Sequence, residues 1–225
     1  MSNGFDFERR QRVYRIRLDE AHRAVGHYIF EFAYLVSQMR ECIEYVLCDD
    51  PEGDRMDARL AMGAAFAEQI TNAFFAICER QAELNAEEAQ VAIRLKTKVK
   101  DAIAERNDFA HGDWSGLWTN QGPTLSRMKP GRRAGALIEQ EFRIEEIDSR
   151  ADAVEDLAEV VTEFAMLCLG FHPLAERTGM AVRVRDIFRF RKREVLRIGR
   201  YAEMPWYEWE DEDGVDDDSV VVDED

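Results

Sequence analysis

The chain has 225 residues, of which 46% are hydrophobic and 34% are charged, so it is long enough to bury one sizeable core. It contains no uncharged apolar run of the length that crosses a membrane. Its amino-terminal stretch, residues 5–10, lacks the apolar segment of a signal peptide. These features argue against a membrane protein, and we expect a cytoplasmic protein that has no membrane partner.

The net charge of −16 is spread unevenly along the chain. Residues 203–225 carry twelve acidic side chains and no basic one, which leaves 30 basic against 34 acidic side chains in residues 1–202. A strongly acidic protein repels nucleic acid, but a body with a net charge of −4 is close to neutral. The charge distribution therefore leaves a nucleic-acid partner open.

The four cysteines all fall in apolar segments with helical patterning: Cys42, Cys48, Cys78 and Cys168. None of them forms a C-x-x-C pair, and no histidine lies at ligand spacing from them. We therefore expect buried thiols, with no disulfide framework, no metal site and no cofactor.

Three helices are predicted in the first half of the chain. From Leu18 to Val46 apolar residues recur at alternating three- and four-residue steps, and Asp49–Gly53 ends this helix. A second helix is expected over about Asp57–Leu84, with one apolar face formed by Phe66, Ile70, Ala73 and Ile77. Asn85, followed by Glu87 and Glu88, is typical of the cap of a third helix. Three such helices predict a helical bundle.

The apolar stripe of the third helix runs through Val91, Leu95, Val99 and Ala102, and its next steps fall on Arg106 and Ala110. An arginine thus stands where the pattern requires an apolar side chain. Gly112 suits a helix C-cap, which places His111 at the end of the helix.

After the third helix we expect a small antiparallel β insert within residues 113–147, with strands near 116–119, 124–128 and 136–144. Asp148 and Ser149 are then expected to cap a fourth helix. Its buried stripe would comprise Val154, Leu157, Val161, Phe164 and Cys168, and it would end at Gly170. The predicted fold is mainly α, a four- to five-helix bundle over residues 8–172.

Residues 173–202 form a basic amphipathic extension, in which Arg183–Arg200 holds eight basic and two acidic residues. Helical spacing would align four arginines into one phosphate-binding stripe, with Phe188 and Phe190 available for stacking on bases: Arg185, Arg189, Arg193 and Arg197. The alternative is the solvated face of a packed helix.

The acidic residues 203–225 are expected to be disordered. If this tail folds back onto the basic stripe through Trp206 and Trp209, it would act as an intramolecular nucleic-acid mimic.

One heptapeptide, Arg106-Asn107-Asp108-Phe109-Ala110-His111-Gly112, resembles the active-site motif of the HEPN-type ribonucleases, in which Arg-Asn is followed after a few residues by His near a helix end. Arg106, Asn107 and His111 match that motif residue by residue. The bare Arg-to-His spacing also occurs at Arg17 and His22, but without the Asn or the helix end. His22, His27 and His172 are interpreted as structural.

The resemblance implies metal-independent cleavage of RNA by a homodimer in which two such motifs meet. Histidine can take the proton of the ribose 2′-hydroxyl or protonate the leaving 5′-oxygen, and arginine can hold two phosphate oxygens. Asn107 would orient either partner. Because a five-residue step places His111 about 140° around the helix from Arg106, the helix must unwind at Ala110 or the two residues must come from different protomers.

The HEPN resemblance further implies a role in a toxin–antitoxin or anti-phage system, with an antitoxin or regulatory protein as a second partner. A plainer interpretation is that Arg106 snorkels from a core edge or pairs with Asp101 or Glu105, while His111 only caps the helix. Between these stands a HEPN-like fold that keeps the motif for binding RNA or a partner without cleaving. The alternative function is a non-catalytic helical interaction protein that docks a partner through the Arg106 face or the Trp206–Trp209 segment.

Overall fold

The computed structural model describes residues 3–48, 62–63, 65–111, 113–119, 122–130, 137–173, 181–191 and 194–197. This part of the chain is mainly helical, with its long helices in a bundle, as the apolar periodicity predicts. The helices are α1 (Asn3–Leu47), α3 (Ala67–Ala82), α4 (Ala86–His111), α5 (Ile144–Leu169) and the short α7 (Val184–Ile187). Helix α1 ends at Leu47, just before the predicted break. The break itself, at 49–53, and the predicted acidic tail, at 203–225, lie outside the described residues.

The chain divides into two compact units. The first comprises residues 1–77 and 96–161, and the second comprises residues 78–95 and 162–225. Helices α3, α4 and α5 each contribute residues to both units. None of the described helices is long and apolar enough to span a bilayer.

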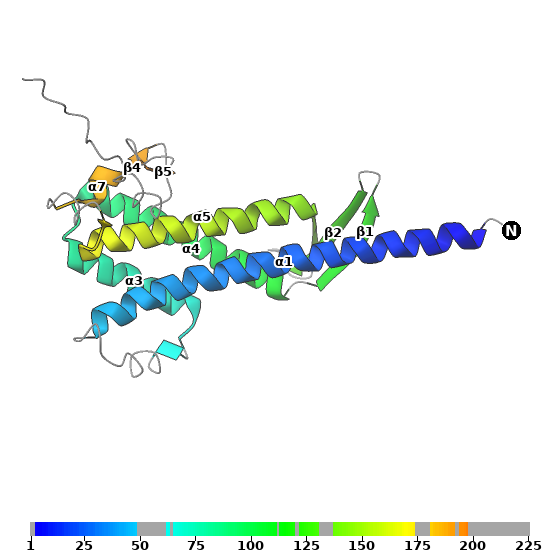
Figure 1. The fold of residues 1–225 in the computed structure, drawn as a ribbon, viewed down its shortest axis with the longest axis horizontal. Coiled ribbons are helices and arrows are strands. Elements are labelled where there is room, and N and C mark those ends of the chain that lie inside the picture. Colours follow the sequence, from blue (N-terminus) through cyan, green and yellow to red (C-terminus); the bar gives the residue numbers. More distant parts are fainter. Residues whose placement is uncertain are drawn as a thin grey trace, which may run out of the picture. The chain divides into compact units, whose positions relative to one another are not determined.

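The core of the first unit is built on α1, which Figure 1 draws as the longest helix. Of the apolar stripe predicted for this helix, Ala21, Tyr28, Phe32, Leu35 and Met39 are buried. Helix α1 begins before the predicted Leu18, because nothing in residues 3–17 stops a helix.

The apolar face predicted for the second helix is partly wrong. Ile70 is buried, but Phe66 precedes the first helical residue of α3 and its side chain is 76% exposed. Phe74 and Phe75 are buried instead and contact each other edge to face at 5.0 Å between ring centroids. Two adjacent phenylalanines are buried here because the helix is enclosed over more than one narrow stripe.

The β insert is confirmed as a three-stranded antiparallel sheet in the order β1-β2-β3. The strands are β1 (Asp113–Thr119), β2 (Gly122–Pro130) and β3 (Leu137–Phe142). The register pairs Gly116 with Leu125, and Leu125 in turn with Phe142. Phe142, at the end of β3, is buried and carries the sheet into the core of the first unit.

The predicted cap of the fourth helix is wrong, because α5 begins at Ile144 rather than after Ser149. The amide of Arg143 donates to the Glu146 carboxylate at 3.1 Å, and the amides of Glu146 and Ile147 donate to the Arg143 carbonyl. These bonds satisfy the amides of an earlier first turn. The end is as predicted: Gly170 has φ +78°, and the Phe171 amide donates to the Met166 carbonyl at 2.9 Å.

In the second unit, the predicted cap of α4 is confirmed. The Asn85 side-chain oxygen accepts the amides of Glu87 and Glu88, and the Glu88 carboxylate accepts the Asn85 amide at 2.9 Å. This reciprocal pair is a capping box.

The predicted stripe of α5 is buried throughout: Val154, Leu157, Val161, Phe164 and Cys168.

All four cysteines are free thiols, and only Cys78 and Cys168 are buried as predicted. These two thiols share a hydrogen bond, which together with burial raises the pKa of Cys78.

The basic extension is not a single helix. After α7 the chain forms the antiparallel hairpin of β4 (Phe188–Arg191) and β5 (Glu194–Arg197). Positions 189 and 197 therefore belong to opposite faces of the hairpin, since residues alternate along a strand. The predicted helical alignment of the four arginines is wrong; Arg193 itself lies outside the described residues. The sequence Phe-Arg-Phe-Arg at 188–191 carries the period of two that is typical of a strand.

Candidate functional site

The three residues of the HEPN-like motif lie on the last turns of α4, in the first unit. His111 and Asn107 are exposed and Arg106 is half-buried. The Arg106 guanidinium donates through Nη1 to the Asn107 side-chain oxygen at 3.2 Å. Asn107 thus restrains the arginine directly, and the imidazole of His111 is accessible to a ligand.

Helix α4 is regular through His111, so it does not unwind at Ala110. The first way for Arg106 and His111 to meet is therefore contradicted, because the two residues lie about 140° apart around one continuous helix. The second way, in which Arg106 of one protomer acts with the histidine of another, stays a prediction.

The buried stripe of α4 does not pass through Arg106. Val91, Leu95, Val99 and Ala102 are buried as predicted, but the stripe then continues to Phe109, which is 2% exposed. Ala110 is exposed. A seven-residue step from Ala102 to Phe109 returns almost to the same side of the helix, so Arg106 flanks the stripe and does not interrupt it.

Beneath the motif lie five residues that contact one another in a closed series, which we name the Tyr28 cluster: Tyr28, Phe109, Phe142, Arg150 and Glu105. They come from α1, α4, β3 and α5. The ring centroids of Tyr28 and Phe109 are 4.6 Å apart, and those of Phe109 and Phe142 are 5.8 Å apart. The Arg150 guanidinium lies 5.3 Å from the centroid of Phe142.

The polar side of the Tyr28 cluster closes the series. The Tyr28 hydroxyl donates to the Glu105 carboxylate at 3.0 Å and lies 3.3 Å from the Ala102 carbonyl. Arg150 forms an ion pair with the other oxygen of Glu105. Burial raises the pKa of the Tyr28 phenol, and the positive charge of Arg150 opposes this shift.

The Tyr28 cluster bears on the plainer interpretation of Arg106. The Glu105 carboxylate, one of the two partners considered for Arg106, is bound by Tyr28 and Arg150. Sequence reasoning missed this cluster because its members are far apart in the chain. One available signal was Tyr28 itself, since a tyrosine in a buried stripe requires a partner for its hydroxyl.

Two of the three remaining histidines lie near carboxylates. In the first unit, His27 is 3.6 Å from a Glu31 oxygen and 3.9 Å from an Asp148 oxygen. In the second unit, His172 is buried and lies 3.8 Å from the buried Glu163 carboxylate. His22 is exposed on α1. Within the described ranges, no three His, Cys, Asp or Glu side chains are grouped so as to hold a metal ion.

Glu31 illustrates how carboxylates crowd around His27. Desolvation raises the pKa of Glu31, and the negative charges of Glu155 and Asp152 raise it further, while His27 lowers it. The acidic neighbours and burial therefore outweigh the effect of His27 on Glu31.

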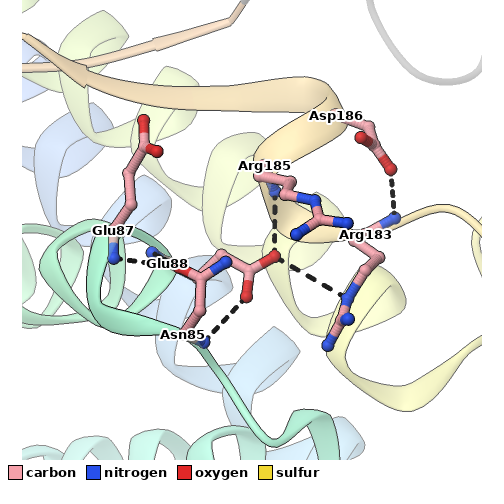
Figure 2. Close-up of polar contacts among 6 residues, drawn as sticks. All are labelled: Asn85, Glu87, Glu88, Arg183, Arg185 and Asp186. Atoms are coloured by element: carbon pink, nitrogen blue, oxygen red, sulfur yellow. Dashed lines mark hydrogen bonds and ion pairs between the residues drawn. The ribbon is translucent and has the colours of Figure 1, made fainter.

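In the second unit, the beginning of the basic extension is held by Glu88 of α4, as Figure 2 shows. The Glu88 side chain is 1% exposed; one of its oxygens accepts the Arg185 amide at 3.3 Å and lies 3.9 Å from Arg183 Nε. The Arg183 amide donates to the Asp186 carboxylate at 2.8 Å. Arg185 thus contributes its backbone to this contact, which leaves its exposed side chain available.

Comparison with known proteins identifies no relative: no protein-family model, no curated protein and no solved structure matches this chain.

Proposed function

We propose that the chain is a metal-independent endoribonuclease of HEPN type that acts as a homodimer. The observation that carries the proposal is the end of α4, where a guanidinium held by Asn107 and an exposed imidazole occur within six residues. These groups supply what cleavage of a phosphodiester beside a 2′-hydroxyl requires, which is a proton acceptor, a proton donor and a cation for the phosphoryl oxygens.

In the proposed reaction, His111 of one protomer accepts the 2′-hydroxyl proton while the 2′-oxygen bonds to phosphorus. The bond from phosphorus to the 5′-oxygen breaks, and the imidazolium formed on the same His111 gives its proton to that oxygen. The products are a 2′,3′-cyclic phosphate and a 5′-hydroxyl. Arg106 binds the phosphoryl oxygens as negative charge builds on them, and Asn107 fixes the plane of the guanidinium.

The Tyr28 cluster supports the proposal because it holds the end of α4 in place. It ties the last turns of α4 to α1, β3 and α5 through contacts on the buried side of the helix. The motif on the other side of α4 therefore stands on a rigid element, as a preorganised site requires. A role in a toxin–antitoxin or anti-phage system, with a neutralising or regulatory protein, is part of the same proposal.

The test is incubation of RNA with the purified protein in EDTA, followed by analysis of the product ends. We expect 2′,3′-cyclic phosphates from the wild type and a loss of about 100-fold to 10,000-fold in His111→Ala. Arg106→Ala should lose about 100-fold or more. His22→Ala is the matched control, because His22 is also exposed and follows an arginine by the same spacing, and it should cleave like the wild type. Equal cleavage by all four proteins, or none by the wild type, would refute the nuclease.

A mixing experiment tests the shared site. Arg106→Ala and His111→Ala should each be inactive, but a heterodimer of the two carries one intact site. Random exchange of subunits should then restore about a quarter of the wild-type activity. If mixing restores nothing while each variant remains dimeric, the two residues do not act across a dimer.

The alternative is a non-catalytic helical module that binds protein or RNA. It is favoured by an apolar face of α1, where Ile16, Phe30 and Tyr34 lie within about 40° of one another and are 48%, 67% and 45% exposed. We take the occupant to be a second copy of α1. An antiparallel pairing centred between Gly26 and His27 sets the exposed Arg12 opposite the exposed Glu41.

The same antiparallel pairing sets Arg23 opposite Phe30, a cation–π pair. Light scattering tests this face: Phe30→Glu with Tyr34→Glu should convert a dimer into a monomer, and Glu20→Gln with Arg40→Gln should not. If the wild type is dimeric, fails to cleave RNA and becomes monomeric in the first variant, the alternative is correct. A dimer that survives the first variant excludes it.

A further inference from the structure

The hairpin of β4 and β5, in the second unit, has two faces of different chemistry. Its register pairs Phe188 with Arg197, Phe190 with Val195, Arg189 with Leu196 and Arg191 with Glu194. Directly paired residues share a face, and residues alternate between the faces along each strand. One face therefore holds positions 188, 190, 195 and 197, and the other holds positions 189, 191, 194 and 196.

Phe188 identifies the inner face. Its side chain is 1% exposed, and the preceding Val184 and Ile187 of α7 are 2% and 1% exposed. We therefore take the face that contains position 188 as the inner face of the hairpin. Positions 189 and 191 belong to the opposite, outer face, and both are arginines.

Helix α7, which directly precedes the hairpin in the chain, brings two further arginines. Glu88, buried at the start of α4, holds the backbone of Arg185 and the guanidinium of Arg183. Both arginines keep exposed surface: Arg185 is exposed, and the Arg183 side chain is 45% exposed. The Asp186 carboxylate accepts a hydrogen bond from the Arg183 amide, and this bond weakens the repulsion between the carboxylate and a bound anion.

We propose that the outer face of the β4–β5 hairpin, together with Arg183 and Arg185, binds the sugar–phosphate backbone of single-stranded RNA. The inference rests on the proposed function for its choice of RNA as the ligand. It assigns the contacts to Arg183, Arg185, Arg189 and Arg191, and it removes Arg197, which shares the inner face with Phe188. A nucleic-acid backbone that is held through charge gives affinity with little sequence preference.

Glu194 is the one acidic position on the outer face, paired with Arg191. Its negative charge opposes a phosphate at that end of the hairpin. Removing this charge should therefore strengthen binding, which an unfolded hairpin would not do.

The experiment measures the fluorescence anisotropy of a labelled oligouridine titrated with full-length protein that carries His111→Ala, so that the probe is not cleaved. In this background, Arg189→Glu with Arg191→Glu should weaken binding about tenfold or more at low salt. The slope of log affinity against log salt should fall by about one to two. Glu194→Gln should strengthen binding, and Arg197→Glu should change it by less than about twofold.

Two outcomes with the variants overturn the inference. One is equal binding by the parent and the double variant, and the other is a loss in Arg197→Glu as large as in Arg189→Glu, which is what a helical stripe requires. Absence of RNA binding by the parent at low salt also refutes it. Cleavage of RNA by the wild type is measured in a separate assay. A protein that cleaves RNA but does not need the hairpin to bind it is thereby distinguished from a protein that does not act on RNA.

Discussion

The two ends of α4 use charged residues in opposite ways. At the first turn, Glu88 is buried and accepts hydrogen bonds from the amides of Asn85 and Arg185. At the last turn, His111 and Asn107 are exposed, and the Arg106 guanidinium donates to the Asn107 side-chain oxygen. The charge at the first turn is explained by the fold. His111 and Asn107 at the last turn are exposed, which is why the proposed function assigns them to a ligand.

The largest expected effect is a difference in stability between two variants of the last turn of α4. Phe109→Ala removes a buried ring that contacts Tyr28 and Phe142, and it should lower the free energy of unfolding by about 3–5 kcal/mol. His111→Ala, two residues away and exposed, should change it by less than about 0.5 kcal/mol. Urea denaturation followed by circular dichroism measures both. A large loss in His111→Ala would make the histidine structural.

The second effect separates two adjacent glutamates at the first turn. Glu88→Ala leaves the amides of Asn85 and Arg185 without their acceptor and should cost about 1–3 kcal/mol. Glu87→Ala removes an exposed side chain and should cost less than about 0.5 kcal/mol. The same denaturation experiment compares them. If the two variants are equally stable, Glu88 does not hold the extension and the contrast between the ends of α4 disappears.

A third effect contrasts two buried carboxylates. Glu88 accepts amide hydrogen bonds, whereas Glu31 faces Glu155 and Asp152, and its pKa is raised above the ordinary value. A raised carboxyl pKa means that the folded state binds the proton more tightly. The stability that this provides is complete below the unfolded pKa and is lost as the pH rises through the folded one. Glu31→Gln should therefore be more stable than the wild type at neutral pH.

The advantage of Glu31→Gln should vanish in acid, where Glu31 is protonated in both folded and unfolded states. Melting temperatures measured from acidic to neutral pH test this dependence. An advantage for the wild type at neutral pH would show that the His27 contact outweighs desolvation and the acidic neighbours.

The smallest effect concerns the acidic tail. Deleting residues 203–225 should leave the melting temperature of the helices unchanged and strengthen RNA binding at low salt, since twelve negative charges are removed. Anisotropy with the oligouridine probe measures it. Unchanged binding at low salt would show that the tail does not compete with RNA.

Local signals in the sequence predicted local structure well. Asn85 with Glu88 marked the start of α4, and Gly170 marked the end of α5, because caps depend on residues within one turn. The start of α5 was missed because Arg143 uses its backbone amide with Glu146, and arginine is not a preferred cap residue. The hairpin was missed because three- and four-residue spacing of arginines outweighed the period of two at 188–191.

In the candidate site too, residues close together in the sequence could be predicted and residues far apart could not. Its exposed residues, Arg106, Asn107 and His111, could be found because they lie within one heptapeptide. The Tyr28 cluster could not, because Tyr28 and Glu105 are 77 positions apart and their pairing is set by tertiary packing. The alignment of Arg106 with the core was inferred wrongly because Phe109, three positions on, completes the buried face.

The buried phenol of Tyr28 gives the protein an optical reporter of its own. With a pKa raised by burial, this tyrosine should ionise later than an ordinary tyrosine in an alkaline titration followed by near-ultraviolet absorbance. Its hydroxyl donates to Glu105, next to the motif arginine, so the delayed ionisation reports whether the support beneath the motif is intact. Variants of the last turn of α4 can thus be ranked by how far they disturb that support, without any attached label.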